Sequence, residues 1–212
     1  MHSIRPSAQL CRSVTVAALL ATSAVPPQAG SRIAAQLHND QWAGRPFENL
    51  LVIGVTQNTA IRGDFERKLA QRLRGRGTRG VASDAVIPVG LIGRRDALEG
   101  TIADLAVDAV IFVRFLSVEH ATGTSGRVGE LTPAAYQGAL YDYHAAAFDW
   151  PATPGFIGKR DMLRLETSPF STDTGNLVWS MVSETYPATS PDTVVGSLSK
   201  LIVKALGRYK LI

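Results

Sequence analysis

The fold is decided by the stretch Leu50-Leu-Val-Ile-Gly-Val55. A continuous apolar run of this length is typical of a strand that is buried on both faces, as parallel strands of α/β proteins are. Residues 108–118 form a longer run, Asp108-Ala-Val-Ile-Phe-Val-Arg-Phe-Leu-Ser-Val118, which is rich in β-branched and aromatic residues. Two such strands, separated by segments with helical periodicity, predict an α/β domain.

The interval between these two runs contains two helical patterns and a short strand. Apolar residues recur every four positions in a helix predicted over residues 64–76, which Asp64 can cap. Residues 80–83 follow as a strand and residues 94–106 as a second amphipathic helix. Strands that alternate with helices through short links imply parallel pairing with right-handed crossovers.

The last fifty residues predict a hairpin and a helix. Apolar and polar residues alternate at 160–168 and 176–186, on either side of residues that favour a turn. A helix over 191–206 follows, with Pro191 at its first position. We therefore expect a βαβαβ unit, then an antiparallel β-hairpin and a C-terminal helix, built as a mixed sheet in two or three layers.

The first 30 residues have the pattern of a secretory signal peptide. Two arginines and no acids precede a mostly apolar run over residues 14–25, which Pro26-Pro27 ends. Such a run is too short to cross the roughly 30 Å of a bilayer's hydrocarbon core. Cys11, the sole cysteine, precedes the run, whereas the lipidated cysteine of a lipoprotein follows it. We expect cleavage between residues 22 and 31, and a periplasmic or secreted protein with no transmembrane helix in the mature chain.

The composition of the remaining chain is that of one globular domain. The 212 residues are 45% hydrophobic and 19% charged, which excludes a disordered tail. The net charge of +4 falls to +2 without the two arginines of the signal region, too little for a general nucleic-acid binder. Residues 31–47 show little periodicity and are expected to form a polar leader, and residues 48–212 a single α/β domain.

Three short motifs match catalytic patterns without the context that the chemistry needs. The glycines of Gly75-Arg-Gly-Thr-Arg-Gly80 follow a helix instead of opening one, which favours a helix end over dinucleotide binding. Ser197-Leu-Ser-Lys200 lacks the partner motifs of penicillin-binding enzymes, and Asp173-Thr-Gly175 lacks the second carboxylate of an aspartic protease. The histidines have no metal-ligand spacing. We expect no catalytic residue set, no metal site and no cofactor.

Residues 121–158 are rich in glycine, proline and aromatic residues and have no sustained period, so they predict a long loop. Aromatic side chains supply contact area at a low cost in entropy. We therefore expect Tyr141, Tyr143 and Trp150 to contact a partner. The alternative is that these rings fold over the sheet and belong to the core.

A run of six cations falls between residues 67 and 79, with no acid among them. Its members are Arg67, Lys68, Arg72, Arg74, Arg76 and Arg79. This pattern is typical of a solvated helix face whose cations suit the negative C-terminal end of the helix. It is also the pattern of a contact with an anionic partner, such as phospholipid head groups, an envelope polymer or an acidic protein surface.

Several of these stretches resemble a group of poorly characterised bacterial envelope proteins, many of which are small lipoproteins. The similarity is carried by residues 47–55, 65–70, 108–113, 167–179 and the terminal helix. The resemblance implies an α/β domain similar to the N-terminal domain of TolB, and it implies no catalytic residues. This chain departs from the group in lacking a cysteine after its apolar run.

Together these features predict an exported, non-catalytic envelope protein that binds a protein or a cell-wall polymer. The alternative is a periplasmic hydrolase whose site is assembled from residues distant in sequence. A deep polar pocket with two coupled titratable groups would favour the hydrolase, and a flat aromatic surface would favour the binding protein.

Overall fold

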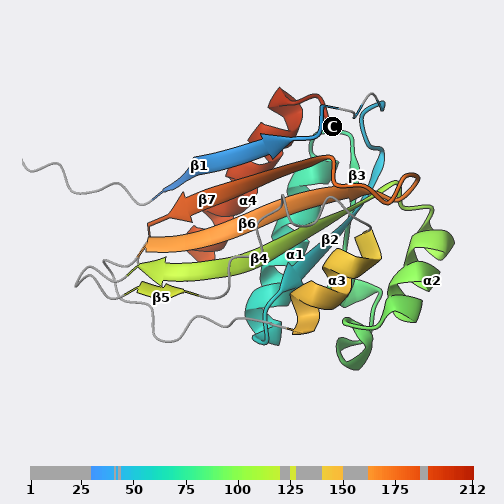
Figure 1. Ribbon diagram of the computed structural model, residues 1–212, viewed down its shortest axis with the longest axis horizontal. Coiled ribbons are helices and arrows are strands. Elements are labelled where there is room, and N and C mark those ends of the chain that lie inside the picture. The colour runs from blue at the N-terminus through green and yellow to red at the C-terminus, as the bar shows by residue number, and fades with distance from the viewer. Residues whose placement is uncertain are drawn as a thin grey trace, which may run out of the picture.

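The computed structural model of the chain describes residues 30–40, 42, 44–119, 125–127, 140–149, 162–186 and 191–212. These residues form a mixed α/β fold around one seven-stranded sheet, which confirms the expected fold class (Figure 1). The strand order is β1-β7-β6-β4-β2-β3, and β5 pairs with β4 beside this path.

The parallel part of the sheet is the predicted βαβαβ unit. Its elements are β2 (Asn49–Val55), α1 (Thr59–Arg74), β3 (Arg79–Ala82), α2 (Arg95–Leu105) and β4 (Ala109–Glu119). Two short 3₁₀ turns, η1 (Ser83–Ala85) and η2 (Val89–Leu91), connect β3 to α2. Strand β2 lies between β3 and β4 and is parallel to both.

The antiparallel part contains the predicted hairpin and C-terminal helix. Its elements are β1 (Ser31–His38), β5 (Ser125–Arg127), β6 (Met162–Ser171), β7 (Trp179–Thr185) and α4 (Pro191–Arg208). Strand β6 pairs with β4 and β7, and β7 pairs with β1, all antiparallel. Gly175 adopts φ 70° in the turn before β7, so the segment 173–175 serves as a turn.

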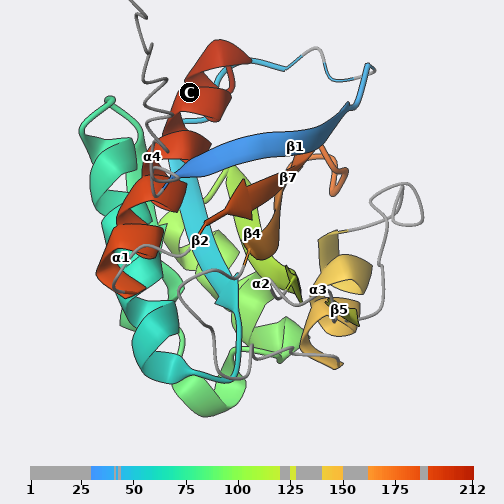
Figure 2. The same ribbon diagram turned by 90° about the vertical axis from the view of Figure 1, so that its left-hand side faces the viewer.

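Helices cover both faces of the sheet, which gives three layers. Figure 2 shows α1 and α4 side by side on one face, and α2 and α3 (Leu140–Asp149) on the other. Alternate residues of β2 therefore enter two cores: Leu50 and Val52 pack with α1 and α4, and Leu51 and Ile53 with α2 and α3. None of the helices in the described ranges has the length and apolar content that crossing a bilayer requires.

Helix α1 begins five residues earlier than the apolar pattern predicts. Its N-cap is Asn58, whose side chain accepts a hydrogen bond of 3.1 Å from the backbone N–H of Ile61, so Asp64 lies inside the helix. The periodicity misses this first turn because its buried residue is Arg62, which is 3% exposed. At the other end Gly77 adopts φ 90°, which confirms that the glycine motif ends a helix.

The segment expected to be a polar leader, residues 31–47, contains the strand β1. Its pairing with β7 runs from Ser31 opposite Thr185 to His38 opposite Trp179. A register shift between Ile33 and Ala35 interrupts the alternation of side chains. Because β1 is an exposed edge strand with a bulge, its sequence lacks the periodic apolar signal of a strand.

The segment expected to be one long loop, residues 121–158, contains β5 and the helix α3. Leu140, Tyr143, His144 and Ala147 are the buried residues of α3 and follow helical spacing. Apart from Leu140, this stripe is made of Tyr, His and Ala instead of strongly apolar residues, so it gives no clear periodic signal. The loop prediction is wrong for this helix.

Candidate functional site

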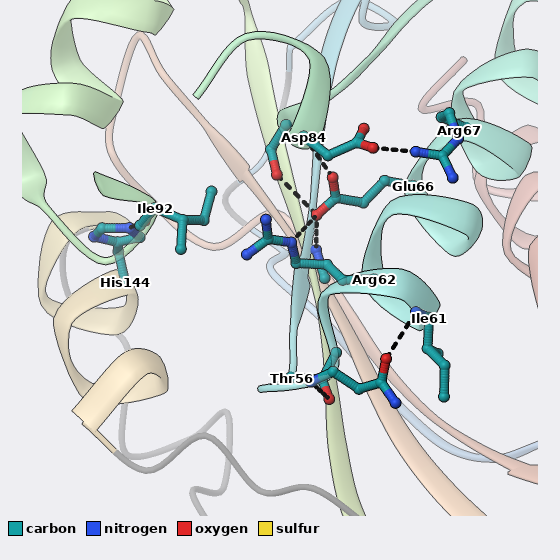
Figure 3. Close-up of polar contacts among 11 residues, drawn as sticks. Thr56, Ile61, Arg62, Glu66, Arg67, Asp84, Ile92 and His144 are labelled. Atoms are coloured by element: carbon teal, nitrogen blue, oxygen red, sulfur yellow. Dashed lines mark hydrogen bonds and ion pairs between the residues drawn. The ribbon is translucent and has the colours of Figure 1, made fainter. Parts of the chain in front are cut away.

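The carboxylate of Glu66 joins α1 to the carboxyl ends of β2 and β3 (Figure 3). Its Oε1 accepts hydrogen bonds from the Gly54 N–H at 2.8 Å and the Ser83 hydroxyl at 2.7 Å, and its Oε2 accepts one from the Asp84 N–H at 2.8 Å. The side chain is fully buried. Burial raises the pKa of Glu66, against the opposite effect of these hydrogen bonds and of Arg62. Both oxygens are therefore occupied by contacts that hold the fold.

Arg62 lies one turn before Glu66 on the same helix and is also buried. Its Nε is 3.8 Å from Glu66 Oε1, which is an ion-pair distance and too long for a hydrogen bond. Within the described part of the chain, this Nε has no hydrogen-bond partner. In Figure 3 the terminal nitrogens of Arg62 are directed away from Glu66, toward the side where Ile92 and His144 lie.

This arrangement has an energetic consequence. A buried donor without a partner costs about 1–3 kcal/mol, and more when the donor is charged. The Coulombic attraction of Glu66 offsets part of that cost, but it satisfies none of the five N–H groups of the guanidinium. A group that can accept hydrogen bonds from Arg62 would be stabilised here.

His144 connects α3 to the segment after η2. Its Nε2 lies 2.8 Å from the carbonyl oxygen of Ile92, and because a carbonyl only accepts, Nε2 carries the proton. Burial lowers the pKa of His144, against the opposite effect of this hydrogen bond. The ring is therefore held in its neutral form. Its other nitrogen, Nδ1, has no hydrogen-bond partner among the described residues.

A second buried ion pair lies on the face of the sheet that α3 covers. Arg114 Nη2 is 2.9 Å from Glu166 Oε2, and these residues are register partners on β4 and β6. The hydroxyl of Tyr143 donates to the same oxygen at 3.2 Å. Burial raises the pKa of Tyr143, and Glu166 adds to this effect. The three side chains form a polar cluster in the core, which ties α3 to two strands.

The aromatic residues expected to contact a partner do not form one surface. Tyr143 is 1% exposed and packs against Phe112 and Phe170, so its assignment to a partner surface is wrong. Tyr141 is partly buried, and its ring centre lies 4.5 Å from the guanidinium carbon of Arg95. Residues two positions apart on a helix are separated by about 200° around its axis, so Tyr141 and Tyr143 point to opposite sides of α3. Trp150 lies outside the described residues.

The six cations of residues 67–79 have different surroundings. Arg67 pairs with Asp84, and Lys68 lies 3.3 Å from Asp192 and 3.6 Å from Asp64. Arg74 donates to the Gly80 carbonyl at 2.6 Å, and Arg79 to the Leu105 carbonyl at 3.4 Å. Arg72 donates from Nε to the Ser199 hydroxyl at 3.1 Å, and Arg76 is exposed.

The contact between Arg72 and Ser199 places the C-terminal halves of α1 and α4 beside each other (Figure 2). Each half exposes cations, and neither residues 69–76 nor residues 199–210 include an acid. We call this group the basic surface; its members are Arg72, Arg76, Lys200 and Lys204, all exposed. Arg74 is not a member, because it lies on the other side of α1 and donates to Gly80 of β3. Only the α1 side of the basic surface was predicted. The lysines of α4 belong to it because of the fold.

The buried Arg62–Glu66 pair was not predicted. A signal for it exists in the sequence: positions 62, 66, 69 and 73 have helical spacing and are all buried, so the charged pair continues the apolar stripe of α1. The described residues contain no group of three acidic, histidine or cysteine side chains placed to hold a metal ion.

No family model matches this chain, and no curated protein matches it. Two solved structures are similar to this chain at a low level, both of PelC dodecamers from Paraburkholderia phytofirmans. The first is 13% identical with a TM-score of 0.44, covering 86% of this chain and 99% of that one. The second, a variant, is 13% identical with a TM-score of 0.43, covering 82% and 95%. At this level of similarity, neither assembly nor function carries over to the present chain.

Proposed function

We propose that this chain is an exported protein of the bacterial cell envelope, which binds an anionic protein or cell-wall polymer and catalyses no reaction on it. The signal-peptide pattern of the first 30 residues and the resemblance to envelope proteins support the location. The basic surface on α1 and α4 is the observation that supports the binding role.

The basic surface is suited to an extended anionic partner. Its cations come from two neighbouring helices, and the hydrogen bond from Arg72 to Ser199 fixes one helix against the other. Arg72 lies in the last turn of α1, where the helix dipole also favours positive charge, and Lys200 and Lys204 lie in the C-terminal half of α4. A surface of one sign attracts a partner of the opposite sign and speeds its association.

The buried carboxylates support binding over hydrolysis. Glu66 uses both oxygens to hold main-chain and hydroxyl groups of β2 and η1, and Glu166 accepts from Arg114 and Tyr143. Each carboxylate thus serves the packing of the sheet and its helices. Among the residues that the structure describes, no comparable observation favours the alternative of a hydrolase.

The test is capture of partners from an envelope extract by the mature protein, with two charge-reversal variants. The first is Arg72→Glu with Arg76→Glu, on the basic surface. The control is Arg94→Glu with Arg95→Glu, which makes the same charge change on exposed residues at the start of α2. We expect the first variant to reduce capture at least tenfold, and the control to retain it.

Salt gives an independent measure, because contacts between exposed charges are screened at high ionic strength. Capture by the unmodified protein should fall steeply when the salt concentration rises from about 0.05 to about 0.5 M. This rise shortens the electrostatic screening length several-fold. Equal capture by both variants, or capture that salt does not change, would show that the basic surface is not the binding site.

A further inference from the structure

We propose that Arg62 is the binding residue of a small-anion site at the carboxyl end of β2, and that the ligand carries a carboxylate or phosphate group. This site is separate from the basic surface and does not depend on the function proposed above. Three independent features of the described residues lead to it.

The first feature is the topology of the sheet. The crossover from β2 to β3 uses α1 on one face, and the crossover from β3 to β4 uses α2 on the opposite face. The chain thus leaves β2 in one direction while β4 lies on its other side, which makes the carboxyl ends of β2 and β4 a topological switch point. In open α/β sheets, ligands bind outside the carboxyl ends of the strands at this position.

The second feature is the N-terminus of α1, a helix of 16 residues that begins just after β2. Its first turn contains no acidic residue, so no side chain of that turn offsets the positive end of the helix dipole. The cap residue Asn58 satisfies one backbone N–H, that of Ile61. A helix start of this kind favours a nearby anion.

The third feature is Arg62 itself, which is only 3% exposed. Its Nε has no hydrogen-bond partner in the described ranges, and the Oε1 of Glu66 that faces it already accepts two hydrogen bonds. Glu66 supplies a compensating charge but no acceptor within hydrogen-bond distance. The guanidinium therefore has its charge compensated, while the donor at Nε is buried and unused among the described residues.

These features define the chemistry of the ligand. A guanidinium presents its N–H groups in a planar fork, which matches two oxygens of a carboxylate or a phosphate. Both the fork and the helix start offer donors and positive charge, so they favour an anionic group. The ligand group accepts from Arg62 on the side directed away from Glu66 (Figure 3).

The experiment follows the side-chain Nε–Hε signal of Arg62 by NMR in the ¹⁵N-labelled mature protein. The signal is assigned by its loss in Arg62→Lys, which keeps a cation beside Glu66 and removes the fork. Inorganic phosphate and sodium acetate are titrated separately, with sodium chloride holding the ionic strength constant. We expect saturable shifts with at least one of the two anions, and the more effective one identifies the ligand group.

Thermal unfolding in the same titrations gives a second measure. The anion should raise the unfolding temperature of the unmodified protein, and Arg62→Lys should weaken the apparent affinity at least tenfold. The matched control is Arg67→Met, which removes an exposed guanidinium of the same helix and should keep the response. The Arg72→Glu with Arg76→Glu variant should keep it too, which separates this site from the basic surface.

Two results would overturn the proposal. One is a wild-type signal that neither phosphate nor acetate shifts beyond the chloride control. The other is an anion response that Arg62→Lys leaves unchanged, which would place the anion elsewhere. The wild-type titration decides the first outcome even if a variant does not fold.

Discussion

The hydroxyl of Tyr143 donates a hydrogen bond of 3.2 Å to Oε2 of Glu166, the oxygen that also accepts from Arg114. One buried atom therefore links the helix α3 to the strands β4 and β6. This contact explains why a segment without an obvious apolar period is a helix docked on the sheet: its polar residues have partners in the core.

Tyr143→Phe removes the hydroxyl and keeps the ring. We expect a loss of about 1.5–3 kcal/mol in the free energy of unfolding, the usual value of a hydrogen bond to a charged acceptor. Tyr143→Ala should cost about 3–5 kcal/mol, because it also leaves a cavity. The control Tyr141→Ala, at a partly exposed position, should cost about 1 kcal/mol. Urea denaturation measures all three, and equal losses at the two tyrosines would contradict the assignment of Tyr143 to the core.

Arg114→Met leaves the buried carboxylate of Glu166 without its cation. We expect a cost of about 3–5 kcal/mol, because the loss of one partner leaves an uncompensated charge in the core. The double variant Arg114→Met with Glu166→Met should recover most of that loss, since both charges are then absent. A double-mutant cycle from chemical denaturation gives the coupling energy, and additive losses would show that the pair does not interact.

Trp179 is fully buried between the sheet and α4. Trp179→Ala should therefore lower the free energy of unfolding by about 3–5 kcal/mol. The midpoint of urea denaturation is the measurement. A midpoint that does not move would mean that the side chain lies on the surface.

The lowered pKa of His144 predicts a pH dependence. In the unfolded chain a histidine has a pKa of about 6.5, so below that pH the unfolded state binds a proton more readily than the folded state. The free energy of unfolding should therefore fall as the pH drops below about 6.5. Above that pH, this contribution to stability is fully present. His144→Gln has no titrating ring and should show a smaller decrease between pH 7.5 and pH 5. Identical slopes for the two proteins would argue against a buried neutral histidine.

The signal-peptide pattern predicts cleavage between residues 22 and 31, because small residues and a proline pair follow the apolar run. N-terminal sequencing of periplasmic material is the measurement. An intact Met1 on protein recovered from the cytoplasm would contradict both the cleavage and the proposed location.

The elements that could be predicted from the sequence are those whose buried residues are apolar and regularly spaced. Strand β2 is a continuous apolar run, β4 is mostly apolar, and α2 and α4 have regular apolar stripes, so their places were found. The first turn of α1 was missed because a buried arginine interrupts the stripe, and β1 because a bulge disturbs its alternation. For β1 the missing information lies in β7, which is distant along the chain; for Arg62 it lies in Glu66, one turn further along the same helix.

The same reason limits what sequence says about the candidate sites. The cations of α1 were predicted as a group, but the lysines of α4 join them only through the packing of two helices. The unused Nε donor of Arg62 depends on Gly54, Ser83 and Asp84, which donate to the oxygens of Glu66. No local sequence pattern indicates that both oxygens of Glu66 already accept hydrogen bonds.

The pairing of β1 with β7 also determines when the domain can be completed. The hydroxyls of Ser31 and Thr185 lie 2.7 Å apart across the two strands, although 154 positions separate them along the chain. The first described strand therefore has no neighbour until nearly the whole polypeptide has been synthesised. Contacts of such long range slow folding. Because the ribosome releases the N-terminus first, residues 31–38 stay without their neighbouring strand until β7 has been synthesised, and β1 is among the last strands that can join the sheet.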